Sequence, residues 1–235
     1  MLLNLRAIHT PRTLDEAAAL VRQSGVFPLY GGGAYLVRWG DSHIESAVTL
    51  TKLIHDGTNS ADHPAWVGAA ATLETLCGLD GNVRRLVKAD TPNTLRHALT
   101  VGDVLMETRP ESLVNALFLA LRAEIVCYGE EPFTLEEWFA KPMIWRGRRI
   151  ILRVTLSGYR TGVTSISLEK VGRTPADIPI VAAVTAQTGA EKVTVISGVD
   201  AHPVVYTPAL TSRLSDYRGS AEYRTAMAHE LAGRG

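Results

Sequence analysis

Apolar and polar residues follow each other in short runs along the chain, and their spacing predicts both helices and strands. Helices are predicted where apolar residues recur every three or four positions behind a capping residue. The predicted helices cover residues 13–23, 110–123 and 220–231, and another begins at the capping box Thr134 to Glu137. Strands are predicted at 26–30, 46–50, 65–71, 124–128, 150–156, 165–171 and 192–199.

This order of elements indicates an α+β fold, and mixed sheets are expected rather than one purely parallel sheet. No low-complexity segment or internal repeat interrupts the pattern. The local composition changes over residues 142–149, where Trp145, Arg146 and Gly147 follow each other. We therefore expect a domain boundary near residue 143.

The composition is that of an ordinary globular protein without a charge bias. The 235 residues contain 24 Lys and Arg against 24 Asp and Glu, so the chain lacks the basic excess of proteins that bind nucleic acid. No apolar run approaches the roughly 18 residues of a membrane span, and the N-terminus lacks signal-peptide features. The two cysteines, Cys77 and Cys127, are too few for an iron–sulfur cluster. We expect a reduced, cytoplasmic protein with both thiols in its core.

The strongest candidate site is the run of three glycines from Gly31 to Gly33, which follows a predicted buried strand. A loop without Cβ atoms can adopt positive φ angles and bring backbone N–H groups close to a ligand. Such N–H groups form a concave site for phosphate oxygens without any basic side chain. The competing interpretation is a plain turn or helix cap, and the loop alone does not decide between the two.

Histidines and triads give weaker signals. His55-Asp56 and Asp62-His63 share one polar loop, but a metal site needs converging ligands with supporting contacts, so a solvated loop is the preferred interpretation. No Ser-His-Asp or Cys-His triad can be argued from spacing, because such partners meet in space.

Seven segments, in order, resemble the flavin-binding subunits of molybdenum hydroxylases, a family that includes the medium subunits of carbon monoxide dehydrogenase and the FAD domain of xanthine dehydrogenase. The segments are residues 11–17, 31–37, 67–73, 96–102, 110–112, 169–177 and 217–224. The resemblance implies a two-subdomain FAD-binding domain over residues 1–142, divided at about residue 60. It also implies a smaller α+β C-terminal domain over residues 143–235.

The family holds FAD with two glycine-containing loops and a few further residues. Carried over to this chain, the implied cofactor-binding residues are Gly31, Gly32, Gly33, Ala34, Leu36, Thr100, Gly102, Ser112 and Lys170. Lys170 is equally compatible with a lysine at a strand end facing water. Five residues depart from the family pattern. Gly33 stands where the family has Thr or Gln, and Ala34 where it has Asp or Ser, so two side-chain hydrogen bonds are missing from the first loop. Asp103 replaces a glycine, Val104 an asparagine and Leu113 an aspartate. On this alignment we expect the Asp103 carboxylate to lie beside the pyrophosphate and repel it.

Two hypotheses for function follow from the resemblance. In the first, the chain is a flavoprotein subunit that passes electrons from an iron–sulfur subunit, fed by a molybdopterin subunit, through FAD to an acceptor. In the second, it is a cofactor-free structural or assembly subunit derived from that family. The intact triple glycine favours the first hypothesis, because glycine in an unused loop has an entropic cost. Asp103, Val104, Leu113 and a short segment between Tyr206 and Ser215 favour the second.

Overall fold

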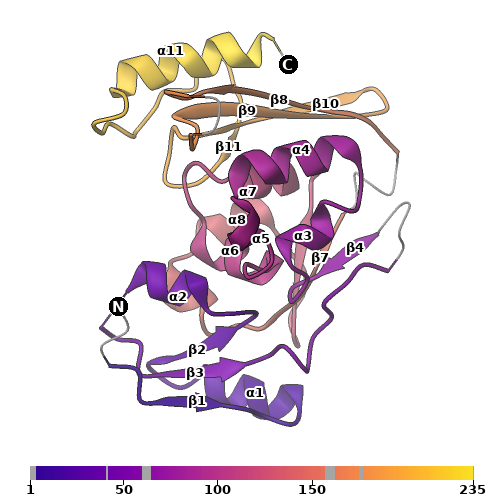
Figure 1. The fold of residues 1–235 in the computed structure, drawn as a ribbon, viewed down its shortest axis with the longest axis vertical. Helices are drawn as coiled ribbons and strands as arrows, with labels where there is room; N and C mark the ends of the chain where they lie inside the picture. The colour runs from indigo at the N-terminus through magenta and orange to yellow at the C-terminus, as the bar shows by residue number, and fades with distance from the viewer. Residues whose placement is uncertain (1–3, 41, 60–64, 157–161, 175–176, 235) are drawn as a thin grey trace.

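The structure, a computed structural model, describes residues 4–40, 42–59, 65–156, 162–174 and 177–234. Three units follow each other along the long axis of the molecule, and the chain passes through them from its N-terminal to its C-terminal end (Figure 1). One hydrophobic core runs through all three units, and a smaller cluster lies under the last helix.

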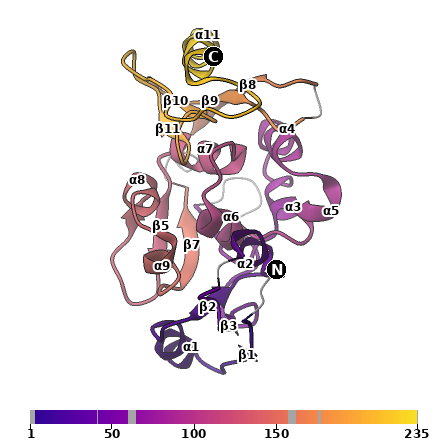
Figure 2. The same cartoon turned by 90° about the vertical axis from the view of Figure 1, so that its left-hand side faces the viewer.

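The N-terminal unit is a parallel three-stranded sheet in the order β1-β3-β2, formed by Ala7–His9, Ser46–Thr49 and Val26–Leu29. Helix α1 (Leu14–Val21) packs on this sheet through Ala17, Ala18 and Val21. As predicted, Thr13 caps α1 by accepting a hydrogen bond from the Glu16 amide. The short helix α2 (Ala34–Trp39) follows β2 and lies between this sheet and the middle unit (Figures 1 and 2).

Over the residues that the structure describes, the middle unit combines an antiparallel sheet with seven short helices. The sheet has the order β4-β7-β5-β6, formed by Trp66–Gly68, Ile151–Thr155, Glu124–Cys127 and Phe133–Thr134. The helices are α3 (Leu73–Leu76), α4 (Gly81–Asp90), α5 (Asn93–Arg96), α6 (Val101–Glu107), α7 (Leu113–Ala120), α8 (Leu135–Phe139) and α9 (Met143–Arg146). Every residue of α7 is buried, which explains why this helix is apolar on all sides except at Asn115, whose side chain donates to the Val104 carbonyl.

The position of β7 bears on the domain boundary. The division at residue 143 stays a prediction, but β7 lies in the middle sheet and pairs with both β4 and β5. Because a central strand cannot be removed from its sheet without unpairing its neighbours, sheet membership favours a division after Leu156.

The C-terminal unit is an antiparallel sheet in the order β11-β10-β9-β8. Its strands are Val204–Val205, Glu191–Ser197, Val181–Thr188 and Val163–Val171. Helix α7 packs on one face of this sheet and α11 (Ala221–Ala232) on the other (Figures 1 and 2). Strand β9 is therefore buried on both faces from Val181 to Ala186, and its apolar run lacks the alternation expected of a half-exposed strand.

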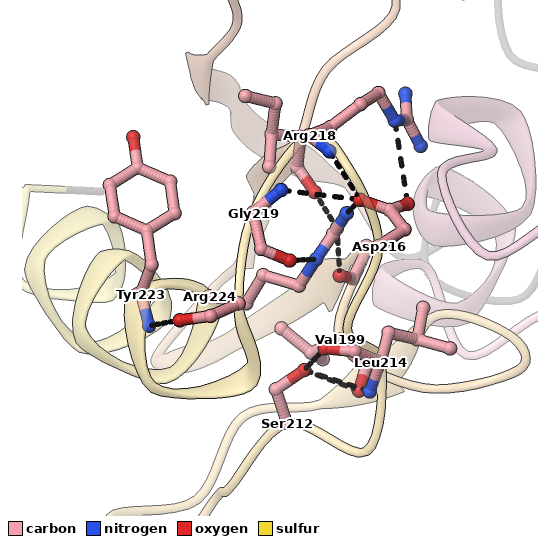
Figure 3. Close-up of polar contacts among 11 residues, drawn as sticks. Val199, Ser212, Leu214, Asp216, Arg218, Gly219, Tyr223 and Arg224 are labelled. Atoms are coloured by element: carbon pink, nitrogen blue, oxygen red, sulfur yellow. Dashed lines mark hydrogen bonds and ion pairs between the residues drawn. The ribbon is translucent and has the colours of Figure 1, made fainter.

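The buried side chain of Arg224 attaches α11 to the C-terminal sheet (Figure 3). Its Nη1 donates to the carbonyl oxygens of Ile180, at 2.6 Å, and Gly198, at 2.7 Å. Its Nε donates to the carbonyl of Gly219 at 3.2 Å, and its Nη2 pairs with an Asp216 carboxylate oxygen at 2.7 Å. One guanidinium group therefore satisfies three backbone acceptors and one carboxylate, where β9 begins and β10 ends.

The prediction of an α+β fold is confirmed, and most predicted strands form within one or two residues of their expected bounds. The expectation of mixed sheets is wrong for the strand pairs described. The N-terminal sheet is entirely parallel and the other two are entirely antiparallel. In the N-terminal unit α1 and α2 connect β1 to β2 and β2 to β3, and these helical crossovers let the three strands run in the same direction.

We predict that Arg224→Met lowers the free energy of unfolding by about 3 kcal/mol, because the carbonyls of Ile180 and Gly198 lose a charged donor. Urea unfolding of the purified variant measures this change. The matched control is Arg234→Met, which removes an exposed pair with Glu230 and should cost less than about 0.5 kcal/mol. Equal effects of the two substitutions would contradict the anchoring role of Arg224.

Candidate functional site

The first glycine loop joins the end of β2 to the start of α2. Gly33 stands at the N-cap of α2 with a φ of 71°, and no side chain of the described residues caps this helix end. The first amides of a helix have no acceptor within the helix, so those of Ala34 and Tyr35 remain for another partner. Gly32 is exposed, and no described atom lies within 4 Å of where its Cβ would stand. The loop therefore offers backbone donors and open space at one place.

The second loop packs directly against the first. A Cβ on Gly31 would stand 2.7 Å from the Thr100 methyl carbon, and one on Gly102 would stand 2.3 Å from the Tyr30 ring. Both glycines are required by this loop-to-loop contact, whatever the loops bind. Of the three consecutive glycines, Gly32 alone faces open space.

The backbone amides of the second loop are used within the protein. Thr100 donates to the Asp103 carboxylate at 3.0 Å, and Asp103 donates back to the Thr100 hydroxyl at 3.2 Å. The amide of Val101 donates to Ala71, and that of Gly102 to another carbonyl of the β4–α3 segment at 2.8 Å. This end of α6 is a closed capping box, so it offers no donor of residues 100–103 to a ligand.

The expectation that Asp103 faces a pyrophosphate is wrong. Its side chain is fully buried, and one oxygen accepts hydrogen bonds from the Thr100 amide and hydroxyl. The other oxygen has no hydrogen-bond partner among the described residues. Desolvation raises the pKa of Asp103 to about 6, while the hydrogen bonds from Thr100 act in the opposite direction. The carboxylate therefore lies beneath Gly31 and stabilises the loop instead of lining its open side.

The remaining predicted site residues do not all gather at the first loop. Ala34 lies there, half-buried, in the first turn of α2. Leu36 is a core residue of the same helix. Ser112 is fully buried and caps α7 through the Asn115 amide. Lys170 lies on β8, in the sheet on the far side of the middle unit (Figures 1 and 2), where its ammonium group contacts the Asp177 carbonyl at 3.5 Å.

Tyr30 is a residue of this region that the sequence did not indicate. Its ring lies against Gly102, and its hydroxyl accepts a hydrogen bond from the Ile151 amide at 2.9 Å. The same hydroxyl donates to the Arg149 carbonyl at 3.3 Å. Tyr30 therefore connects the first loop to the second loop and to β7, across 121 residues of sequence.

The two cysteines and the polar loop at His55 and Asp56 were further candidates from the sequence. Cys77 and Cys127 are both buried and unpaired, as predicted, and burial raises the pKa of the Cys127 thiol to about 12. His55 and Asp56 are exposed, whereas Asp62 and His63 lie outside the described residues. Within the part of the chain that the structure describes, no group of three His, Cys, Asp or Glu residues could hold a metal ion. None of the helices described is long and apolar enough to cross a bilayer.

Comparison with known proteins identifies relatives of this arrangement. Residues 4–156 match the family described as the FAD binding domain in molybdopterin dehydrogenase. A chain of carbon monoxide dehydrogenase from Hydrogenophaga pseudoflava superposes with a TM-score of 0.84 at 17% identity, covering 100% of this chain and 97% of that one. A chain of carbon monoxide dehydrogenase from Oligotropha carboxidovorans gives 0.77 at 20% identity, with 100% and 97% covered.

A further structural match is quinoline 2-oxidoreductase from Pseudomonas putida 86, with a TM-score of 0.74 at 15% identity, covering 97% of this chain and 94% of that one. No curated protein matches the sequence. At these identities the structural matches show the shared fold, while the family match shows the ancestry of residues 4–156.

We predict that Asp103 makes the stability of the protein depend on pH. Since its pKa is higher in the folded chain than the usual 3.8, the unfolded chain ionises first as pH rises. The free energy of unfolding should therefore fall between about pH 4 and about pH 6 and stay lower above that window. Asp103→Asn removes this dependence, so the variant should gain on the order of 3 kcal/mol relative to wild type from about pH 4 to pH 7.

Urea unfolding of both proteins across this pH range measures the difference. The exposed substitution Glu131→Gln serves as the control for a change of one charge. A constant difference between wild type and Asp103→Asn at all pH values would show that the carboxyl group titrates normally.

Proposed function

Since the chain belongs to the family of FAD-binding domains of molybdopterin dehydrogenases, we propose that it is the flavoprotein subunit of a molybdenum hydroxylase-type complex. In this role it receives electrons from iron–sulfur clusters and passes them through FAD to an acceptor. The observation that carries the proposal is the uncapped start of α2 beside the open position at Gly32. This is the only one of the two glycine loops that keeps backbone donors for a pyrophosphate, as far as the described residues go.

The residues present fit FAD through the first loop. Gly32 supplies the space for close approach, and Ala34 and Tyr35 supply N–H groups at the positive end of the α2 dipole. When bound, the flavin supplies the electron-transfer chemistry, and the protein supplies position and electrostatics. The chain's own task is to hold the pyrophosphate without a basic side chain.

The second loop acts through the first in this proposal. The Thr100 methyl group leaves no room for a side chain at Gly31, and the Tyr30 ring lies where a side chain at residue 102 would stand. These contacts set the path of the first loop. Leu36 supports the same region from the core as a packed side chain of α2. Ser112 is buried as the cap of α7, and its contact with FAD stays a prediction. A contact between Lys170 and the flavin stays a prediction.

The proposed partners are an iron–sulfur subunit and a molybdopterin subunit. With only two cysteines, both buried and 50 residues apart, this chain has no ligand set of its own for a cluster. Electrons must therefore reach its flavin from another polypeptide. Two unpaired thiols in the core also agree with the reducing cytoplasm as its location.

A specific observation favours the second hypothesis, a cofactor-free structural subunit. The amides of Thr100, Val101, Gly102 and Asp103 all donate within the protein, so a dinucleotide would bind to one loop only. A subunit that kept the fold and the interface alone would need no more than this packing. The two hypotheses differ in one measurable property, which is the affinity for FAD.

We predict that the purified protein is yellow or takes up added FAD stoichiometrically, with flavin bands in the near-UV and blue. Gly32→Val should abolish this binding because the added side chain fills the space in front of the helix amides. The fold should survive, since nothing described lies within 4 Å of the new Cβ. Isothermal titration calorimetry with FAD measures the affinity, and far-UV circular dichroism checks the fold.

The matched control is Gly57→Val, which also points into open space but lies in another loop. It should bind FAD as the wild type does. A colourless wild-type protein that releases no heat with FAD would establish the cofactor-free hypothesis instead. Unchanged binding by Gly32→Val would place the cofactor elsewhere.

We also predict that the chain works in a hetero-oligomer. Affinity purification of a tagged chain from its native cells should bring down a small iron–sulfur subunit and a large molybdopterin subunit. Mass spectrometry identifies the chains, and metal analysis of the eluate should find both iron and molybdenum. A monomer that oxidises a substrate unaided would contradict this arrangement.

A further inference from the structure

A cavity of about 450 Å³ lies at the ends of α2 and α6 that are opposite to the glycine loops. The last turn of α2 contributes Arg38 and Trp39, and the segment after α6 contributes Arg109. Helix α9 contributes Met143 and Arg146, its first and last residues. The lining thus brings three arginines from three separate segments to one space.

Two of these arginines are already paired with acidic side chains. The Arg38 guanidinium lies 2.8 Å from the Glu107 carboxylate. Arg109 lies 3.0 Å from the buried Asp90 carboxylate and 3.6 Å from that of Glu107. Their charges are therefore balanced within the protein, and neither requires a ligand.

Arg146 is not balanced in this way. Only 5% of the residue is exposed, its Nε has no hydrogen-bond partner, and no carboxylate among the described residues pairs with it. Its Nη1 donates to the Leu105 carbonyl at 3.3 Å. Desolvation by burial lowers the pKa of the guanidinium to about 10, and the charge interaction with Tyr35 acts in the opposite direction. Burying an unpaired charge costs free energy, and an anion in the cavity would recover it.

A purely structural role explains Arg146 poorly. The Leu105 carbonyl already accepts a hydrogen bond from the Trp138 indole at 3.0 Å, so it does not need a second donor. An uncharged side chain of similar length would fill the same volume beside α6 without the desolvation cost. The charge itself is the feature that the fold leaves unexplained.

We propose that this cavity is a binding site for a small-molecule oxyanion, a phosphate or a carboxylate, held by the guanidinium group of Arg146. Guanidinium groups bind both kinds of oxyanion through paired N–H donors. Tyr35, Trp39 and Met143 form an apolar wall suited to the body of such a ligand. Because the lining includes none of residues 31–34, we treat this site as separate from the proposed pyrophosphate site.

Isothermal titration calorimetry with inorganic phosphate, acetate and benzoate tests the proposal on the full chain. We expect one saturable site for phosphate or for a carboxylate, with benzoate binding more tightly than acetate if the apolar wall contacts the ligand. Arg146→Met should weaken binding about ten- to a hundredfold. The control Arg213→Met removes an exposed arginine elsewhere and should leave the affinity unchanged.

The melting temperatures of the Arg146 variants show whether a loss of binding comes from a loss of folding. Without anion, Arg146→Met should melt at the same temperature as the wild type or higher, because it removes an uncompensated buried charge. Arg146→Lys keeps the charge but loses the forked donors, so it should bind with intermediate affinity. A lower melting temperature for Arg146→Met would overturn the proposal. An anion affinity that does not depend on residue 146 would also overturn it.

Two other results would overturn it. One is the absence of binding of all three anions up to roughly 10 mM. The other is displacement of the bound anion by FAD, which would make the cavity a part of the dinucleotide site. Retained anion binding in protein saturated with FAD supports a separate site.

Discussion

Direct contact between two glycine loops is the constraint on which the functional region depends. Gly31 meets Thr100, and Gly102 meets the Tyr30 ring, at distances that admit no Cβ atom. This contact joins the N-terminal unit to the middle unit and leaves Gly32 facing outward, next to the uncapped start of α2. Gly31 and Gly102 are therefore required by close packing, whereas Gly32 faces open space, and the sequence alone does not distinguish these two situations.

Asp103 shows how one substitution can change the role of a loop. Placed where a ligand would lie, its charge would repel a pyrophosphate. In the structure the carboxylate turns inward and closes a capping box with Thr100. Together with the hydrogen bonds from the Val101 and Gly102 amides to carbonyls of the β4–α3 segment, this uses every amide of residues 100–103. Of the two loops, only the first keeps backbone donors for a ligand among the described residues. The burial of the carboxylate has a cost, which is visible in the raised pKa of Asp103.

Two buried arginines illustrate different solutions to one physical problem. Arg224 satisfies its guanidinium with three carbonyl oxygens and the Asp216 carboxylate, and in doing so attaches α11 to the sheet (Figure 3). Arg146 is almost as buried, but among the described residues its side chain has one long hydrogen bond, to the Leu105 carbonyl, and it lines a cavity. A fully paired buried charge belongs to the architecture, whereas an unpaired one beside open space indicates a ligand.

The sequence alone determined the α+β class, most strands, the capped helices and the glycine loop as a candidate site, because these depend on local periodicity and on residues near in sequence. It did not reveal β9, whose apolar run is continuous because helices cover both faces of its sheet. The direction of the Asp103 carboxylate follows from a local signal that the sequence does carry, because Thr100 and Asp103 have the spacing of a capping box. The part played by Tyr30 and the isolation of Arg146 were decided by tertiary structure. Both depend on which groups from distant segments meet in space, and spacing along the chain carries no information about that.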